Sequence, residues 1–176
     1  NPSGKLTMSF PRNVGQVPVY YNFKNTGRPS TSIEQVTNSG YADVENSPLY
    51  SFGYGLSYTE FKYSDFEISS STMTKDSKIN ASIRVTNTGN YKGEEVVQLY
   101  LRDIVGSIAR PMKELKGFEK IELNPGESKI VNFEIENSLL EFYSYNNVWE
   151  SEPGKFHVFI GTDSNVRDHK EFYLTN

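Results

Sequence analysis

The chain has no cysteine among its 176 residues. Disulfide bonds, thiolate nucleophiles and thiolate metal sites are therefore excluded. It also lacks an apolar run of about eighteen residues, so we expect no membrane span. The net charge of −4 is mild and provides no basic face for nucleic acid or anionic lipid. Nucleic acid and membranes are accordingly not expected as partners.

Sequence motifs for cofactors and metals are missing as well. Gly53-Tyr54-Gly55 lacks the strand-to-helix setting that a phosphate-binding loop requires. No DxDxDG-type calcium loop and no HExxH zinc motif occurs in the sequence. We therefore expect neither a cofactor nor a metal site.

What the chain does contain is a regular alternation of apolar and polar residues from Thr59 onward, bounded by Gly, Pro or Asn. This pattern predicts about seven or eight short strands at roughly ten-residue spacing, which is typical of an all-β immunoglobulin-like sandwich. The expected strands are Glu60–Ser69, Lys78–Thr88, Glu94–Asp103, Met112–Leu123, Lys129–Glu136, Asn147–Ser151, Lys155–Thr162 and Glu171–Leu174. Ser138–Tyr143 indicates a short helical turn.

A tight turn is predicted at Asn124-Pro125-Gly126-Glu127. Pro125 presets a backbone angle of the turn, and Gly126 takes the left-handed position that a side chain disfavours. This succession of a strand, a tight turn and a second strand is typical of an antiparallel sandwich.

Residues 1–58 differ from the rest, because short apolar pieces alternate with Pro, Gly, Asn and Ser. We expect an extended, mostly irregular segment, with one strand at Val17–Phe23 and a mobile loop at Gly27–Gly40. Ser47–Leu56 carries too many large apolar side chains for a solvated linker and predicts a buried connector.

Three stretches carry a family resemblance: RPMKELKGFEKIEL followed by NPGES, SPLYSFGYGLSYTEFKYSDF, and SGKLTMSFPRNVGQVPVYYNFKNTGRP. Together they resemble the C-terminal fibronectin-III-like domain of family 3 glycoside hydrolases, the β-glucosidase and β-xylosidase group. The resemblance implies that residues 1–58 end a preceding α/β domain and form a connector, and that residues 59–176 form the sandwich.

The resemblance also implies a longer parent chain with a catalytic (β/α)8 barrel and an α/β domain. Such parents are retaining enzymes that hydrolyse terminal β-D-glucosides. Since the sequence starts at Asn1 with no initiator Met, we interpret it as a C-terminal piece. By family habit the parent is expected to be exported, to the bacterial periplasm or the extracellular space.

No catalytic residue is expected in the chain itself. Ser64-Asp65-Phe66 superficially resembles the family's nucleophile motif, but Asp65 falls in a predicted sandwich strand and is interpreted as solvent-facing. Glu94 and Glu95 are neighbours on a strand and point to opposite faces. Asp43 and Glu45 could share a face, but no third ligand is near them in sequence.

The remaining polar candidates are interpreted as structural. The two histidines, His157 and His169, are expected to be solvated surface residues, with His157 pointing away from the core. Asn80-Ala81-Ser82 is a glycosylation sequon that matters only in a eukaryotic secretory host. Basic and apolar residues alternate between Arg110 and Ile121, which predicts the polar and apolar sides of one strand region, with Lys113, Lys116 and Lys120 on the polar side and Phe118 on the apolar side.

The leading functional hypothesis is a non-catalytic accessory domain that packs against the catalytic barrel and α/β domains of its own parent chain. The residues expected at this interdomain contact are Phe10, Tyr20, Tyr21, Phe52, Tyr54, Leu56 and Tyr58. Separated from those domains, the piece is expected to self-associate.

Two alternatives remain open. The first is a carbohydrate-binding module that stacks glycans on Tyr143, Tyr145 and Trp149. The second is an adhesive immunoglobulin-like repeat, which predicts further copies of the sandwich, although no internal repeat is present in this chain.

Overall fold

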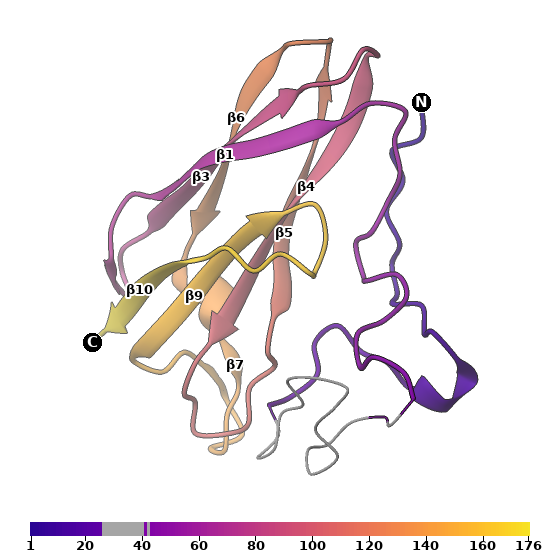
Figure 1. Ribbon diagram of the computed structural model, residues 1–176. Helices are drawn as coiled ribbons and strands as arrows, with labels where there is room; N and C mark the ends of the chain where they lie inside the picture. Colours follow the sequence, from indigo (N-terminus) through magenta and orange to yellow (C-terminus); the bar gives the residue numbers. More distant parts are fainter. Residues whose placement is uncertain (26–40, 42) are drawn as a thin grey trace.

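The protein is a two-sheet β-sandwich with an irregular N-terminal segment along one side (Figure 1). The structure, a computed structural model, describes residues 1–25, 41 and 43–176. The loop expected at Gly27–Gly40 lies outside the described residues. The predicted all-β sandwich is confirmed.

The smaller main sheet has three antiparallel strands in the order β1-β3-β6. These strands are β1 (Phe61–Ile68), β3 (Ile79–Asn87) and β6 (Ser128–Ile135). Alternate residues of β3 are buried, among them Ala81 and Val85, as the period of two in the sequence predicts.

The larger sheet has five strands in the order β2-β10-β9-β4-β5. They are β2 (Thr72–Thr74), β4 (Gly93–Asp103), β5 (Glu114–Leu123), β9 (Gly154–Gly161) and β10 (Lys170–Thr175). All neighbours are antiparallel except β10 and β2, which are parallel. The three-residue β2 was not predicted; its Met73 is fully buried in the core.

The core lies between the two sheets. Its members come from the inward faces of both sheets and include Val85, Val97, Leu99, Val131, Ile135, Phe156, Val158 and Phe172. The rings of Phe156 and Phe172 are stacked with their centroids 5.3 Å apart. Each of these large side chains contributes roughly 1.5–3 kcal/mol to the free energy of folding before entropy is subtracted.

Three small elements complete the fold. The four-residue helix α1 (Asn137–Leu140) confirms the predicted helical turn, and it leads into a hairpin of β7 (Phe142–Tyr143) and β8 (Trp149–Glu150). The predicted turn before β6 is also present, since the backbone N–H of Glu127 donates to the carbonyl of Asn124 and Gly126 has φ +77°.

Among the described residues before Phe61, the one helical element is the 3-10 turn η1 (Val14–Gln16). The strand predicted at Val17–Phe23 was wrong. Pro18 has no N–H to donate to a ladder, and the following Tyr21 packs its ring on Phe52 instead. The segment instead pairs with itself: Leu6 N–H donates to the carbonyl of Tyr54, and Gly53 N–H donates back to Leu6.

The N-terminal segment covers part of the outer face of β4. Gln98 and Tyr100 point away from the core, yet both are buried, because Tyr21 packs edge-on against Tyr100 at 6.2 Å between centroids. Gln98 Nε2 donates to the carbonyl of Gly53 at 3.1 Å. Gly53 has φ +81°, and a Cβ there would meet Gln98 Oε1 at 2.2 Å, so the contact requires glycine.

Candidate functional site

The seven residues expected at an interdomain contact divide into two groups. Tyr21, Phe52 and Tyr54 are only partly exposed and pack within the chain. The rings of Tyr21 and Phe52 are stacked with centroids 4.1 Å apart, and the ring of Tyr54 lies 5.1 Å from that of Tyr50. These three side chains join the N-terminal segment to itself and to the sandwich.

The other four side chains are exposed to solvent. Relative exposure is 43% for Phe10, 62% for Tyr20, 69% for Leu56 and 75% for Tyr58. Exposed aromatic and aliphatic groups of this size are available for contact with another surface. The first three residues thus attach the N-terminal segment to the sandwich, whereas the other four are exposed for contact with another surface.

A shallow groove of about 470 Å³ lies beside Tyr20. Thr7, Met8, Ser9, Pro11 and residues 17–22 line it, together with Phe52. Sequence reasoning missed Met8, Val14 and Val17, whose side chains are also more than half exposed. We call Met8, Phe10, Val14, Val17 and Tyr20 the N-terminal apolar surface.

The segment that carries this surface is tied to the sandwich by a buried ion pair. Lys5 Nζ lies 3.0 Å from Glu95 Oε1, and the two side chains are only 12% and 6% exposed. The hydroxyl of Tyr63 donates to the same carboxylate oxygen at 2.9 Å. Burial and the neighbouring Glu95 carboxylate raise the pKa of Tyr63, so its hydroxyl stays protonated as a donor.

Glu94 lies on the opposite face of β4, as expected for a neighbour on a strand. Its carboxylate pairs with Lys120 at 2.7 Å and accepts a hydrogen bond from Ser3. The hydrogen bond from Lys120, together with that from Ser3, lowers the pKa of Glu94. The two adjacent glutamates therefore serve two separate ion pairs and share no proton.

Glu45 pairs with Arg12 at 2.8 Å and also accepts from Ser47. The interaction joins the two halves of the N-terminal segment. The carboxylate of Glu45 therefore makes a structural contact and does not form a shared site with Asp43.

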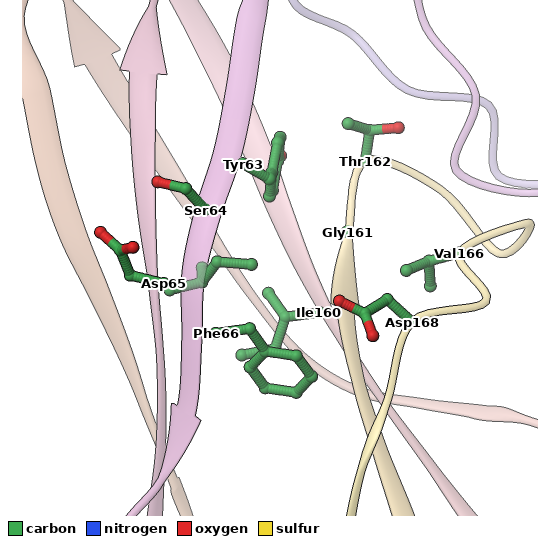
Figure 2. Close-up of a pocket in the computed structure, with 10 residues that line it drawn as sticks. Tyr63, Ser64, Asp65, Phe66, Ile160, Gly161, Thr162, Val166 and Asp168 are labelled. Carbon is green, nitrogen blue, oxygen red and sulfur yellow. The ribbon is translucent and has the colours of Figure 1, made fainter.

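Asp65 occupies a bulge on β1 with φ +51°. Its carboxylate is exposed and pairs with Arg84 of β3 at 2.7 Å. A pocket of about 380 Å³ separates β1 from β9 and the residues that follow β9. Figure 2 shows Asp65 on the far side of β1 from Asp168, so the two carboxyl groups lining this pocket do not face each other.

A retaining glycosidase needs two carboxyl groups about 5–5.5 Å apart across one bond. The floor of the pocket is formed by apolar core residues such as Phe66 and Ile160, as Figure 2 shows. The geometry is that of a gap between β1, at the edge of the smaller sheet, and the end of β9 in the larger sheet, rather than of a paired-carboxylate site.

The second aromatic candidate is the β7–β8 hairpin. Tyr143 and Trp149 are cross-strand neighbours with ring centroids 6.0 Å apart and planes at 66°. Tyr145 in the intervening turn is 82% exposed, and Trp149 is 69% exposed. The structure therefore brings the three predicted glycan-stacking residues to one hairpin.

The region from Arg110 to Ile121 is not the simple two-sided strand that its alternation predicts. Phe118 is 67% exposed, whereas the side chain of Arg110 is only 11% exposed, so that expectation was wrong. The guanidinium of Arg110 lies over the ring of Phe142 at 4.1 Å and binds Glu114 at 2.9 Å. The basic side chain is therefore used to join β5 to the β7–β8 hairpin.

Lys113 makes buried structural contacts that the sequence pattern did not predict. Its ammonium donates to the carbonyls of Ser164 and Val166 and lies 4.3 Å from the ring centroid of Phe159. Burial lowers the pKa of Lys113 to about 8, with nearby Arg102 and Arg167 acting in the same direction. The residue fixes the connection between β9 and β10.

The histidines also depart from expectation. They were predicted as solvated surface residues, but their rings are stacked with centroids 4.1 Å apart, and the side chain of His157 is only 16% exposed. His157 does point away from the core, as predicted. Because the two histidines are twelve positions apart in sequence, their contact depends on the pairing of β9 with β10.

In the described part of the chain, every helix is too short and too polar to cross a membrane.

Comparison with known proteins identifies the fold. Residues 95–164 match the fibronectin type III-like domain family. The chain is 55% identical over 165 residues to the periplasmic beta-glucosidase of Salmonella typhimurium, covering 93% of this chain and 22% of that protein. It is 41% identical to thermostable beta-glucosidase B of Acetivibrio thermocellus, covering 93% of this chain and 22% of that protein.

The crystal structure of beta-glucosidase from Listeria innocua in complex with glucose superposes with a TM-score of 0.91 at 42% identity. The match covers 99% of this chain and 24% of that chain. The sandwich is thus a fibronectin type III-like domain, and the chain spans less than a quarter of the length of these relatives. The chain is therefore similar to the part of these beta-glucosidases that contains a fibronectin type III-like domain.

Proposed function

We propose that the chain is a structural module that packs the N-terminal apolar surface against the other domains of a longer β-glucosidase. The supporting observation is the exposure of five apolar side chains on a segment that is itself fixed to the sandwich. The occupant is proposed to be the parent's own α/β domain, since residues 1–58 resemble the end of that domain. The remaining three-quarters and more of each relative's length supplies the surface to be covered.

The buried contacts beneath the segment favour a fixed rather than a floating connection. Lys5–Glu95, Gln98–Gly53 and Tyr21–Tyr100 all join the segment to β4. Because the segment is fixed to the sandwich, a neighbouring domain that packs on its apolar surface is held in a fixed orientation relative to the sandwich. We infer that the module holds the catalytic domains in register while bond cleavage takes place on them.

The parent is proposed to hydrolyse terminal β-D-glucosides in carbohydrate catabolism. Relatives named as β-glucosidases support the glucoside, although a relative from Formosa agariphila is named putative beta-xylosidase at 49% identity. The name of the Salmonella relative supports an exported parent, in the bacterial periplasm or outside the cell.

The test uses the longer parent chain with Tyr20→Asp, which places a charge on the N-terminal apolar surface. Tyr145→Asp is the matched control, because Tyr145 is also exposed but lies on the β7–β8 hairpin. We expect Tyr20→Asp to lower the thermal midpoint of the catalytic unit and its hydrolysis of an aryl β-glucoside, and Tyr145→Asp to change neither. Equal behaviour of the two variants contradicts the proposal.

Carbohydrate binding is the second candidate, supported by the exposed rings of Tyr143, Tyr145 and Trp149. The T-shaped contact argues against a flat platform, because two rings at 66° cannot both lie parallel to one sugar ring. Trp149 is the chain's one tryptophan, so its fluorescence reports on this hairpin alone. A saturable change with cello-oligosaccharides that Trp149→Ala removes would establish binding; an unchanged signal rejects it.

A further inference from the structure

The outer face of the larger sheet brings three metal-ligating side chains together. His157 on β9 lies directly opposite Glu171 on β10 in the antiparallel register. His169 comes two residues before Glu171, so the alternation along an extended chain places both on the same face. Phe156 and Val158, the neighbours of His157, point into the core, which leaves His157 on the outside.

The three groups converge through their ligand atoms. His157 Nε2 lies 3.0 Å from Glu171 Oε1, and His169 Nε2 lies 3.8 Å from the same oxygen. All three ligand atoms lie within 4.8 Å of one another. A tetrahedral ion with bonds of about 2.0–2.1 Å holds its ligand atoms roughly 3.4 Å apart. Because the two imidazole rings are stacked with their planes at 17°, the rings must rotate out of the stack for both lone pairs to point at one ion.

The hydrogen bonding of His169 favours a ligand role. Its Nδ1 lies 3.1 Å from the carbonyl oxygen of Arg167. Since a carbonyl can only accept, this contact places the hydrogen of a neutral ring on Nδ1 and leaves a lone pair on Nε2, which lies 3.8 Å from Glu171 Oε1. Metal-binding histidines are generally oriented by such a bond from the other ring nitrogen.

The site is half open. The side chains of His169 and Glu171 are 36% and 43% exposed, while that of His157 is 16% exposed. An ion held by the three groups therefore keeps a position for water. Two imidazoles with one carboxylate suit zinc, copper or nickel, whereas magnesium and calcium prefer oxygen ligands alone.

Two basic residues oppose cation binding: Lys155 on β9, and Arg102, which lies opposite His157 in the pairing of β4 with β9. Lys155 lies two residues before His157 on β9, and its ammonium is 2.7 Å from Glu171 Oε1. A bound metal ion must share the carboxylate with this charge or displace it. Affinity is therefore limited by Lys155, and removing its charge should strengthen binding.

We propose that His157, His169 and Glu171 form a binding site for one divalent transition-metal ion of the zinc class. The ion links β9 to β10 across the outer face of the sheet. The site is distinct from the N-terminal apolar surface and does not depend on the proposed structural function.

The test is calorimetric titration of zinc into the chain, prepared without a polyhistidine tag. The chain has two histidines and no cysteine, so imidazole coordination elsewhere in it is ruled out. We expect saturation at one ion per chain. His157→Gln and His169→Gln should each weaken binding about tenfold or more, and Lys155→Gln should strengthen it.

Glu122→Gln is the matched control for Glu171→Gln. Glu122 is also an exposed carboxylate paired with a lysine, Lys92, but it lies on β5, at the edge of the same sheet. The control should bind zinc like the native chain, and Glu171→Gln should bind more weakly. Circular dichroism verifies that each variant is folded.

Imidazole nuclear magnetic resonance of the native chain supplies a readout that needs no substitution. Both rings should shift together on adding zinc, and His169 should show the Nδ1–H tautomer beforehand. The proposal is overturned if zinc does not saturate the chain up to millimolar concentration. It is equally overturned if zinc binds while the two rings stay unmoved, or if the histidine variants bind like the native chain.

Discussion

Lys5 Nζ lies 3.0 Å from Glu95 Oε1 in a buried ion pair that joins residues 90 positions apart. Removing one partner of such a pair leaves an uncompensated buried charge. We predict that Lys5→Met lowers the free energy of unfolding by about 3 kcal/mol, measured by urea denaturation. The exposed pair Lys92–Glu122 provides the control, and Lys92→Met should have little effect. Similar losses in the two variants would contradict a buried attachment of the N-terminal segment.

Two glycines with positive φ separate backbone strain from steric contact. A Cβ at Gly53 meets the buried amide of Gln98 at 2.2 Å, whereas a Cβ at Gly126 meets nothing within 4 Å. Gly126→Ala should cost about 1 kcal/mol through the left-handed backbone alone. Gly53→Ala should cost about 2–3 kcal/mol, since the clash is added to that strain. Equal unfolding free energies for the two variants would show that the side chain of Gln98 moves aside without an energetic penalty.

Lys113 should make stability depend on alkaline pH. Its pKa is lowered to about 8 by burial, whereas an unfolded lysine titrates at about 10.4. Between these values the unfolded chain binds more protons than the native one, so the Lys113 contribution rises with pH. We expect the native chain to gain stability relative to Lys113→Met as pH rises from 8 to 10. A difference that stays constant across that range contradicts the burial of the ammonium.

The N-terminal apolar surface should drive self-association of the 176-residue chain when no other domain covers it. We expect the mean mass measured by sedimentation to increase with concentration. Tyr20→Asp should abolish this increase, while Tyr145→Asp should leave it unchanged. A chain that stays monomeric at all concentrations would contradict self-association through this surface.

The regular strands could be predicted because their residues repeat with a period of two. In β3 and β6, alternate residues from Ile79 and Val131 point into the core, and short-range pattern is sufficient to show it. The three-residue β2 escaped prediction, since only Met73 in it is apolar and three residues contain no period. Val17–Phe23 was wrongly predicted as a strand because aromatic content favours strands, while its tyrosine packs across to Phe52.

The candidate sites depend on long-range contacts that a local pattern does not contain. The alternation along the strand predicts that Glu94 and Glu95 lie on opposite faces, but it cannot predict that Lys5 forms an ion pair with Glu95. Register between two strands determines whether His157 and His169 meet, and the sequence of either strand alone does not specify register. Which aromatic residues are packed and which are exposed likewise depends on the path of the N-terminal segment, and a local sequence pattern does not contain that path.

Hydrogen exchange of the N-terminal segment tests the central claim most directly. Amide exchange over Thr7–Asn22 is compared between the 176-residue chain and the longer parent chain, with the β7–β8 hairpin as an internal reference. A covered N-terminal apolar surface predicts slower exchange over Thr7–Asn22 in the parent and no change in the hairpin. Identical exchange of Thr7–Asn22 in the two proteins would contradict the structural role of this surface.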